Sequence, residues 1–105
     1  MRFNHALVNL YRDGRDMMGF HSDAEPELGR DPVLASVSFG ATRRFLLRSK
    51  RKSERGIIEY RLGHGSLLVM SGSLQHHFRH GVPRESRPVA RRINVTFRLL
   101  IRAPE

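Results

Sequence analysis

Cysteine and tryptophan are both absent from this chain of 105 residues. Without cysteine the protein forms no disulfide framework and no zinc site with thiolate ligands, and the lack of cysteine fits a reducing compartment. No apolar run approaches the roughly 18 residues that a bilayer-spanning helix needs, and residues 1–5 lack the apolar core of a signal peptide. We therefore expect a soluble protein with no membrane partner, located in the cytoplasm, or in the nucleus if its source is eukaryotic.

Acidic residues are also scarce. Ten Asp and Glu stand against nineteen Lys and Arg, which gives a formal net charge of +9, and nearly all of the excess is arginine. The planar guanidinium group binds phosphate and carboxylate through two parallel hydrogen bonds. The charge predicts a polyanionic partner, with nucleic acid as the leading candidate, although a solvated basic surface without a partner has the same composition.

The length of the chain suits one domain at most, near the lower end of what buries a self-sufficient core. The hydrophobic fraction of 39% is modest but adequate for a globular protein. We therefore expect residues 1–105 to form a single domain and to act as a monomer.

Short strands separated by turn signals dominate the pattern, and helical periodicity is scarce. Apolar or alternating runs predict strands at residues 6–11, 32–40, 42–48, 57–62, 66–70 and 92–98. Residues 50–55 form a polar, charged break that is typical of an exposed hairpin loop. About seven short strands joined by turns favour an all-β fold, and we expect a double-stranded β-helix, the jelly roll of the cupin type.

The last predicted strand has the clearest alternation. Its polar residues share one face because residues two apart in a strand point the same way; they are Arg92, Asn94, Thr96 and Arg98. The two guanidinium groups are spaced to engage two carboxylates, or both ends of one dicarboxylate, although a basic exterior strand has the same pattern. Asn9 and Tyr11 on the first strand are further donors to a carboxylate, or else ordinary strand residues.

His21-Ser22-Asp23 is the first motif with the chemistry of a metal site. In an extended segment both ligands project to the same side, where they can hold adjacent positions on one metal ion. A distant histidine completes a facial triad of two histidines and one carboxylate, which leaves the opposite face of the metal open. The motif alone is weak, since the six histidines and four aspartates produce it by chance about 0.2 times in such a chain.

Several histidines are candidates for the third ligand. They are His64, in a turn, and His76, His77 and His80. In a strand only one of the adjacent His76 and His77 can face a site. His80 is mildly favoured, because the Gly-Val-Pro that follows it marks a strand end.

Five segments, taken together and in order, resemble the AlkB-type dioxygenases, which depend on iron(II) and 2-oxoglutarate. The segments are NLYRDGRD (9–16), HSDAEPELG (21–29), ASVSFGATR (35–43), HGSLLVM (64–70) and RINVTFR (92–98). The resemblance runs from about residue 9 to residue 98 with plausible spacing, and an ordered series is far more specific than any single motif.

The resemblance implies a role for each site residue. It implies that His21, Asp23 and His80 bind Fe(II), the last because it precedes its turn as the distal histidine of the family does. Contacts to 2-oxoglutarate are implied for Asn9, Tyr11, Arg92, Asn94 and Arg98. Glu25 matches the acidic residue of the family that faces the target base.

The implied reaction is the O2-dependent hydroxylation of an N-alkyl group on a damaged DNA or RNA base. The adduct then releases an aldehyde, and the cosubstrate becomes succinate and carbon dioxide. The target base must be flipped out of a duplex or presented in a single strand, because methyl groups on its Watson–Crick face are otherwise inaccessible.

The chain also departs from the family pattern. Family members carry a segment before the first core strand that forms a lid over the nucleotide, and this chain starts almost at the core. We therefore expect the lid to be missing, either because the chain is a fragment of a longer enzyme or because it is a minimal variant. Phe20 and Phe78 stand where many relatives have tryptophan.

Three functions are compatible with these observations. The first is an active dioxygenase that demethylates alkylated nucleic acid, with a preference for single strands. The second is a truncated, weakly active or inactive core that still binds metal and keto acid. The third is a basic nucleic-acid-binding module whose histidines and aspartate are incidental.

Overall fold

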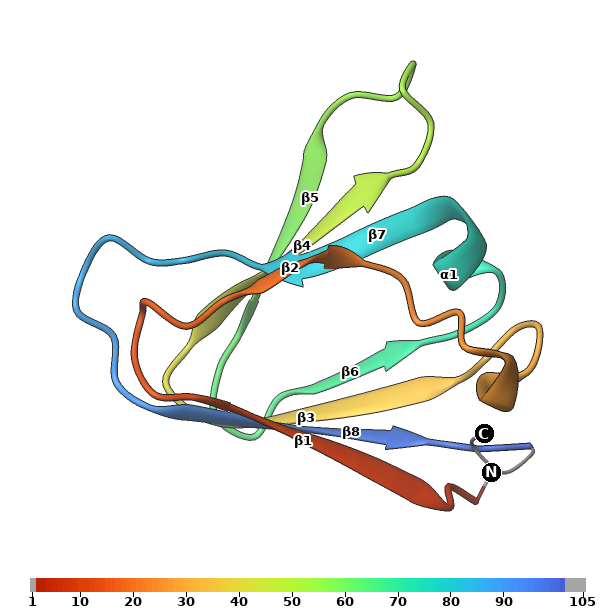
Figure 1. Cartoon of the computed structure of the whole chain (residues 1–105). Coiled ribbons are helices and arrows are strands. Elements are labelled where there is room, and N and C mark those ends of the chain that lie inside the picture. Colours follow the sequence, from red (N-terminus) through yellow and green to blue (C-terminus); the bar gives the residue numbers. More distant parts are fainter. Residues whose placement is uncertain (1, 102–105) are drawn as a thin grey trace.

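Eight short strands and two short helical turns make up the fold (Figure 1). The computed structural model describes residues 2–101. The strands are β1 (His5–Tyr11), β2 (Met18–His21), β3 (Leu34–Gly40), β4 (Arg43–Ser49), β5 (Ile57–Leu62), β6 (Leu67–Met70), β7 (Phe78–Val82) and β8 (Arg92–Arg98). The helical turns are η1 (Pro26–Leu28) and α1 (Leu74–His77). Within residues 2–101, neither of these helical turns is long or apolar enough to cross a membrane.

The strands form two facing antiparallel sheets of four strands each. Their orders are β1-β8-β3-β6 and β2-β7-β4-β5, so strands from opposite ends of the chain lie side by side. The sheets lie close together at one end and diverge toward the end where α1 and η1 lie (Figure 1). This pairing of early with late strands is the jelly roll that the sequence predicts, and the all-β expectation is confirmed.

The six predicted strands lie within about two residues of β1, β3, β4, β5, β6 and β8, whereas the sequence pattern does not predict β2 and β7 as strands. Both His76 and His77 lie in α1, so the strand alternation that would let only one of them face the site does not apply to them. Backbone and side-chain donors of one residue hold this turn: Lys50 N donates to the carbonyl of His77, and Lys50 Nζ donates to the carbonyl of Gln75. The helical conformation of α1 is therefore stabilised by Lys50, 25 residues earlier in the chain, and the local sequence alone does not predict it.

The first sheet has buried polar side chains on its inner face and most of its exposed apolar side chains on its outer face. In β8 the side chains of Arg92 and Arg98 are buried, with 2% and 9% of their surface exposed, whereas Phe97 is 37% exposed. Most of the exposed apolar side chains of the four strands lie on the outer face, because strand neighbours in register share a face; they are Val8, Leu10, Phe39, Leu67, Val69, Ile93 and Phe97. Leu7, opposite Thr96 on the inner face, is the exception among the described residues. The inner face of this sheet therefore combines a polar stretch along β8 with buried apolar residues such as Leu34 and Met70, and the polar stretch suits a polar ligand.

Candidate active site

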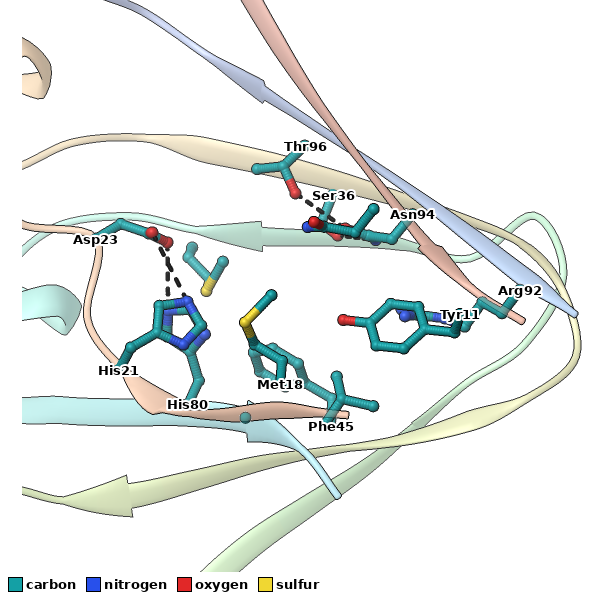
Figure 2. A pocket seen from close by; sticks show the side chains of 14 residues that line it. Tyr11, Met18, His21, Asp23, Ser36, Phe45, His80, Arg92, Asn94 and Thr96 are labelled. Carbon is teal, nitrogen blue, oxygen red and sulfur yellow. Dashed lines mark hydrogen bonds and ion pairs between the residues drawn. The ribbon is translucent and has the colours of Figure 1, made fainter. Parts of the chain in front are cut away.

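A pocket between the two sheets collects most of the residues that the sequence singles out. Figure 2 shows His21, Asp23 and His80 at one end and Tyr11 and Arg92 at the other, with Met18 and Phe45 between them. Asn9 and Asn94 line the same pocket, and so do Ser36 and Thr96. The pocket thus combines a cluster of metal-type ligands with a polar, cationic far end.

The cluster at the first end has the dimensions of a metal site. One ligand atom from each of His21, Asp23 and His80 can be chosen so that all lie within 4.8 Å of one another. The Asp23 carboxylate lies 3.9 Å from Nε2 of His21 and 3.3 Å from Nε2 of His80. Three neighbouring ligands at about 2.1 Å from one ion lie about 3 Å apart, so the donor set fits a divalent metal after small adjustments.

The ring of His21 is oriented for this role by its own strand. Its Nδ1 lies 2.9 Å from the carbonyl oxygen of Gly19. A carbonyl only accepts, so Nδ1 carries the proton and the lone pair of Nε2 is left facing Asp23. A histidine that binds a metal usually has its second nitrogen held in this way.

Close packing of β2 on β7 brings the two histidines together. His21 and His80 are Cα partners across these strands, and their ring centroids lie 4.4 Å apart. Gly81 permits this approach, because a Cβ atom at its position would lie 2.9 Å from the carbonyl oxygen of Met18. Glycine at position 81 therefore allows β2 and β7 to pack closely.

The carboxyl group of Asp23 is held in its ionised form. Partial burial raises its pKa, but the hydrogen bond and the charge of His80, with the charges of His21 and Arg98, outweigh burial. The pKa of Asp23 therefore lies below its ordinary value. An ionised carboxylate is the form that binds a metal.

Two residues near the cluster were not found by sequence reasoning. Ser22, the middle residue of the motif, donates its hydroxyl to the carbonyl of Phe78 at 2.7 Å. Gln75 is 2% exposed, and its Oε1 accepts a hydrogen bond from the backbone N–H of Asp23 at 2.8 Å. Both contacts tie the loop after β2 to the segment around β7, and neither has a signal in the local sequence.

The far end of the pocket is built to receive an anion. Nη2 of Arg92 donates to the hydroxyl of Ser38 at 2.9 Å, and the guanidinium carbon lies 5.0 Å from the ring centre of Tyr11. Nε and Nη1 of Arg92 are buried and make no hydrogen bond within residues 2–101. Burial lowers the pKa of Arg92 from its ordinary value, yet a guanidinium stays charged in proteins. A buried cation with free donors fits a carboxylate.

Asn94 connects the two ends along β8. Its Nδ2 donates to the hydroxyl of Ser36, and its Oδ1 accepts from the hydroxyl of Thr96 at 3.0 Å. Asn9 is its Cα partner on β1 and lines the pocket beside it. Ser36, Ser38 and Thr96 belong to the site although the sequence analysis assigned them no role. Their spacing of two residues within β3 and β8 puts them on one face, but only the strand register shows that this face lines the pocket.

Arg98 and Glu25 lie beside the pocket rather than in its lining. Nη2 of Arg98 lies 3.7 Å from Oε1 of Glu25, and Nε of Arg98 is buried with no hydrogen-bond partner among the described residues. Arg98 is close enough to Asp23 to lower the pKa of that carboxyl. The two arginines of β8 therefore serve opposite ends of the site, with Arg92 far from the metal-type cluster and Arg98 near it.

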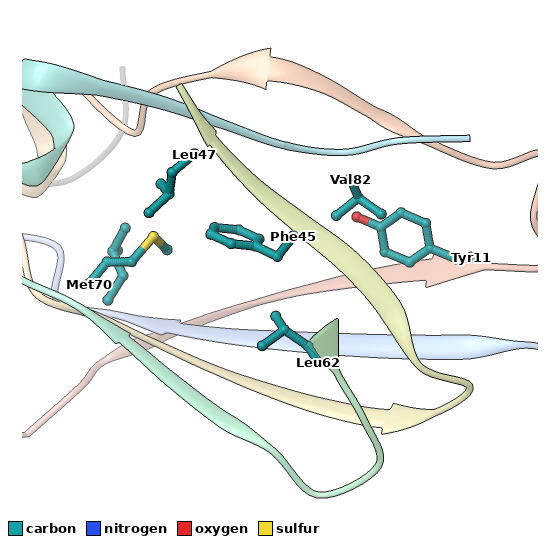
Figure 3. Packing of buried hydrophobic residues seen from close by; sticks show 7 residues of the cluster. Tyr11, Phe45, Leu47, Leu62, Met70 and Val82 are labelled. Atoms are coloured by element: carbon teal, nitrogen blue, oxygen red, sulfur yellow. The ribbon is translucent and has the colours of Figure 1, made fainter. Parts of the chain in front are cut away.

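The hydrophobic core lies between the two sheets and supports the site from both of them (Figure 3). Its buried members are Tyr11, Leu34, Phe45, Leu47, Leu62, Met70 and Val82. The ring of Phe45 stacks on that of His80 with centroids 5.4 Å apart, and Tyr11 belongs both to the core and to the pocket. Packing of apolar side chains thus fixes the orientation of groups on both sides of the pocket.

The remaining candidate histidines lie outside the cluster. Nδ1 of His64 accepts a hydrogen bond from the backbone N–H of Gly40. His76 contacts the Arg30 carbonyl and Asp31, and His77 is exposed at the end of α1. Of the four candidates for the third ligand, the structure brings only His80 to His21 and Asp23 in the part of the chain that it describes.

Comparison with known proteins agrees with this arrangement. The 2OG-Fe(II) oxygenase superfamily matches residues 1–98. The alpha-ketoglutarate-dependent dioxygenase alkB homolog 3 of Rattus norvegicus is 44% identical over 109 residues, covering 97% of this chain and 37% of that protein. The DNA oxidative demethylase ALKBH2 of Homo sapiens is 39% identical over 105 residues, covering 94% of this chain and 40% of its own length.

A solved structure extends the likeness to three dimensions. The structure of OsALKBH1 superimposes with a TM-score of 0.73 at 25% sequence identity, covering 94% of this chain and 49% of that chain. The chain thus spans less than half the length of these relatives, and the shared part contains the whole pocket. Its sequence, fold and pocket place it in one family: the chain belongs to the 2OG-Fe(II) oxygenase superfamily, among the AlkB-type dioxygenases.

Proposed function

We propose that this chain is the catalytic core of an iron(II)- and 2-oxoglutarate-dependent dioxygenase that removes alkyl groups from nucleic-acid bases. One observation carries the proposal: a pocket with a His-Asp-His cluster at one end and, at the other, a buried arginine with two donor atoms that have no partner among the described residues. A dicarboxylate that chelates a metal through one end needs a cation for the other end, and this pocket offers both.

In this proposal His21, Asp23 and His80 hold Fe(II), which supplies the oxidation of an alkyl group by O2 when it is bound. Arg92 binds the distal carboxylate of 2-oxoglutarate through Nε and Nη1, which have no other partner in the described chain. Arg98 contacts the other end of 2-oxoglutarate, the carboxylate nearer the metal, because Arg98 lies close to Asp23.

The other residues of the pocket orient the cosubstrate. Tyr11 lies against the guanidinium of Arg92 and limits the directions in which that group can point. Asn9 provides a donor between the two ends of the pocket, and Asn94, whose amide N–H groups are engaged by Ser36 and the Val37 carbonyl, lines the pocket beside it. Glu25, beside the pocket, contacts the target base, and in the structure its carboxylate lies 3.7 Å from Nη2 of Arg98.

The substrate class follows from charge and accessibility. A net charge of +9 attracts a polyanion, and the relatives include a protein named as a DNA oxidative demethylase. A base in a single strand reaches the pocket without the few kcal/mol, roughly, that unstacking from a duplex costs. We therefore expect methylated single-stranded DNA or RNA to react faster than the matched duplex.

The test counts both products from oligonucleotides that carry one N-methylated base. With Fe(II), O2 and 2-oxoglutarate, the protein should release formaldehyde and succinate in equal amounts, and Asp23→Ala should release neither. Succinate without formaldehyde would indicate a core that turns over keto acid but does not demethylate. Binding of the oligonucleotide without either product would reduce the chain to a basic nucleic-acid-binding module.

A further inference from the structure

Gln75 is buried at the metal-type cluster without being one of its ligands. Its side chain is 2% exposed, and all three of its polar contacts lie inside the protein. Oε1 accepts from the backbone N–H of Asp23 at 2.8 Å and lies 3.3 Å from Nε2 of His80, while Nε2 of Gln75 donates to the sulfur of Met70 at 3.7 Å. One amide oxygen therefore contacts two of the three residues in the cluster.

We propose that Gln75 is a positioning residue that fixes Asp23 for metal binding, an inference that rests on the proposed function. Asp23 lies in the segment between β2 and η1, outside any strand that would fix its backbone. The hydrogen bond from Gln75 supplies that restraint from α1, 52 residues further along the chain. Without it, the carboxylate would have to be ordered at the moment the metal binds, which lowers affinity.

The support of Gln75 is itself rigid. Its backbone carbonyl accepts from Lys50 Nζ at 2.7 Å, so α1 is fastened to the end of β4. Ser22 fastens the same loop to the carbonyl of Phe78, at the start of β7. Gln75 is therefore held independently of Asp23, and the anchored Ser22 keeps the loop within reach, so the bond from Gln75 is the contact that fixes the backbone of Asp23 itself.

The contact between Gln75 and His80 opposes metal binding, whereas the bond to Asp23 favours it. A carbonyl oxygen can only accept, so this contact holds the proton on Nε2 of His80, the atom that would bind the metal. Metal binding must give up that contact. The bond to Asp23 is shorter, 2.8 against 3.3 Å, and Nε2 of His80 has the Asp23 carboxylate as an alternative acceptor. The restraint on Asp23 therefore dominates, and losing Gln75 should weaken metal binding.

Two substitutions separate positioning from simple filling of space. Gln75→Leu keeps a similar volume and removes the acceptor, whereas Gln75→Glu keeps an acceptor oxygen in place. We expect Gln75→Leu to weaken Mn(II) binding about tenfold or more, as is typical when an outer partner of a ligand is lost. Gln75→Glu should bind Mn(II) within a few-fold of the unaltered protein, and the melting temperature of metal-free Gln75→Leu should fall little.

Calorimetric titration with Mn(II), without 2-oxoglutarate, measures the affinities. Amide hydrogen exchange of metal-free protein provides a second readout, in which the Asp23 N–H should exchange faster in Gln75→Leu than in Gln75→Glu. Equal Mn(II) affinity of Gln75→Leu and the unaltered protein would overturn the inference, and so would an equal loss in both variants. If the unaltered protein itself binds no Mn(II), the proposed function fails and takes this inference with it.

Discussion

His77 and His80 lie close together in the sequence but in opposite environments. His80 is 5% exposed and its Nε2 is 3.3 Å from Asp23, whereas His77 lies at the solvent-exposed end of α1. We expect His80→Ala, like His21→Ala and Asp23→Ala, to abolish Fe(II) binding, because a facial triad does not tolerate the loss of one ligand. His77→Ala and His64→Ala should bind Fe(II) normally in anaerobic titrations. Loss of iron in His77→Ala with retention in His80→Ala would show that the third ligand is misassigned.

Arg92 gives a second prediction for a single residue. Lysine cannot reproduce the paired donors of the guanidinium, and a hydrogen bond to a charged group contributes about 1.5–3 kcal/mol. Arg92→Lys should therefore raise the half-saturating concentration of 2-oxoglutarate about tenfold or more, measured by succinate release. Arg44→Lys is the matched control, because Arg44 pairs with Glu59 and Glu85 away from the pocket. A comparable rise in the control would contradict the assignment of Arg92.

Residue types and spacing predicted some site residues and left others hidden. His21, Asp23 and Arg92 stood out because their side chains carry chemistry at strand spacing. Gln75 could not be found in this way, since its role depends on a contact with a backbone N–H 52 residues away. Ser36 has the same limitation, because a serine in a strand acquires a role only when the register places it opposite a polar partner.

Among the elements, the pairing of β2 with β7 is the one on which the cluster depends. Gly81 has no room for a side chain, because a Cβ atom there would lie 2.9 Å from the Met18 carbonyl oxygen. Gly81→Ala should push β2 away from β7, lower the free energy of unfolding by about 1–3 kcal/mol and weaken metal binding. Gly19→Ala is the control in the same pair of strands, since a Cβ atom at Gly19 meets nothing within 4 Å. Thermal unfolding and Mn(II) titration of both variants test this, and equal effects would contradict it.

The elements also show where hydrophobic patterning misleads. The alternation in β8 predicted the strand and its two faces, and the boundaries agree with the structure. The pattern did not predict that the polar face is the buried one, with Arg92 2% and Asn94 7% exposed. An apolar face usually lies toward the core. Under the proposed function, a pocket for a polar cosubstrate accounts for the reversal in β8.

At the scale of the whole molecule, positive charge gathers away from the pocket on the β4–β5 hairpin. The hairpin projects from the second sheet (Figure 1), and with Arg79 it forms a groove lined by Arg48, Lys50, Arg51, Lys52 and Arg55. One of these charges is partly neutralised, because Arg51 lies 3.5 Å from Glu54. The overall charge of +9 is thus partly concentrated on this hairpin. We expect nucleic acid to contact the protein there.

This concentration leads to a prediction about salt dependence. If the hairpin contacts the phosphates of a single strand, each lost contact should reduce the slope of log affinity against log salt by about 0.7. Arg55→Ala should show this change, and Arg51→Ala should show a smaller one because Glu54 already screens that charge. Arg15→Ala removes the same formal charge from the β1–β2 loop, where Arg15 pairs with Asp13, and should leave the slope nearly unchanged.

The measurement is the affinity for an unmethylated oligonucleotide at several salt concentrations, together with the 2-oxoglutarate requirement. The hairpin variants should leave that requirement unaltered, because their charges lie outside the pocket. An equal loss of slope in all three variants would show that the strand is attracted by net charge alone and not by this hairpin.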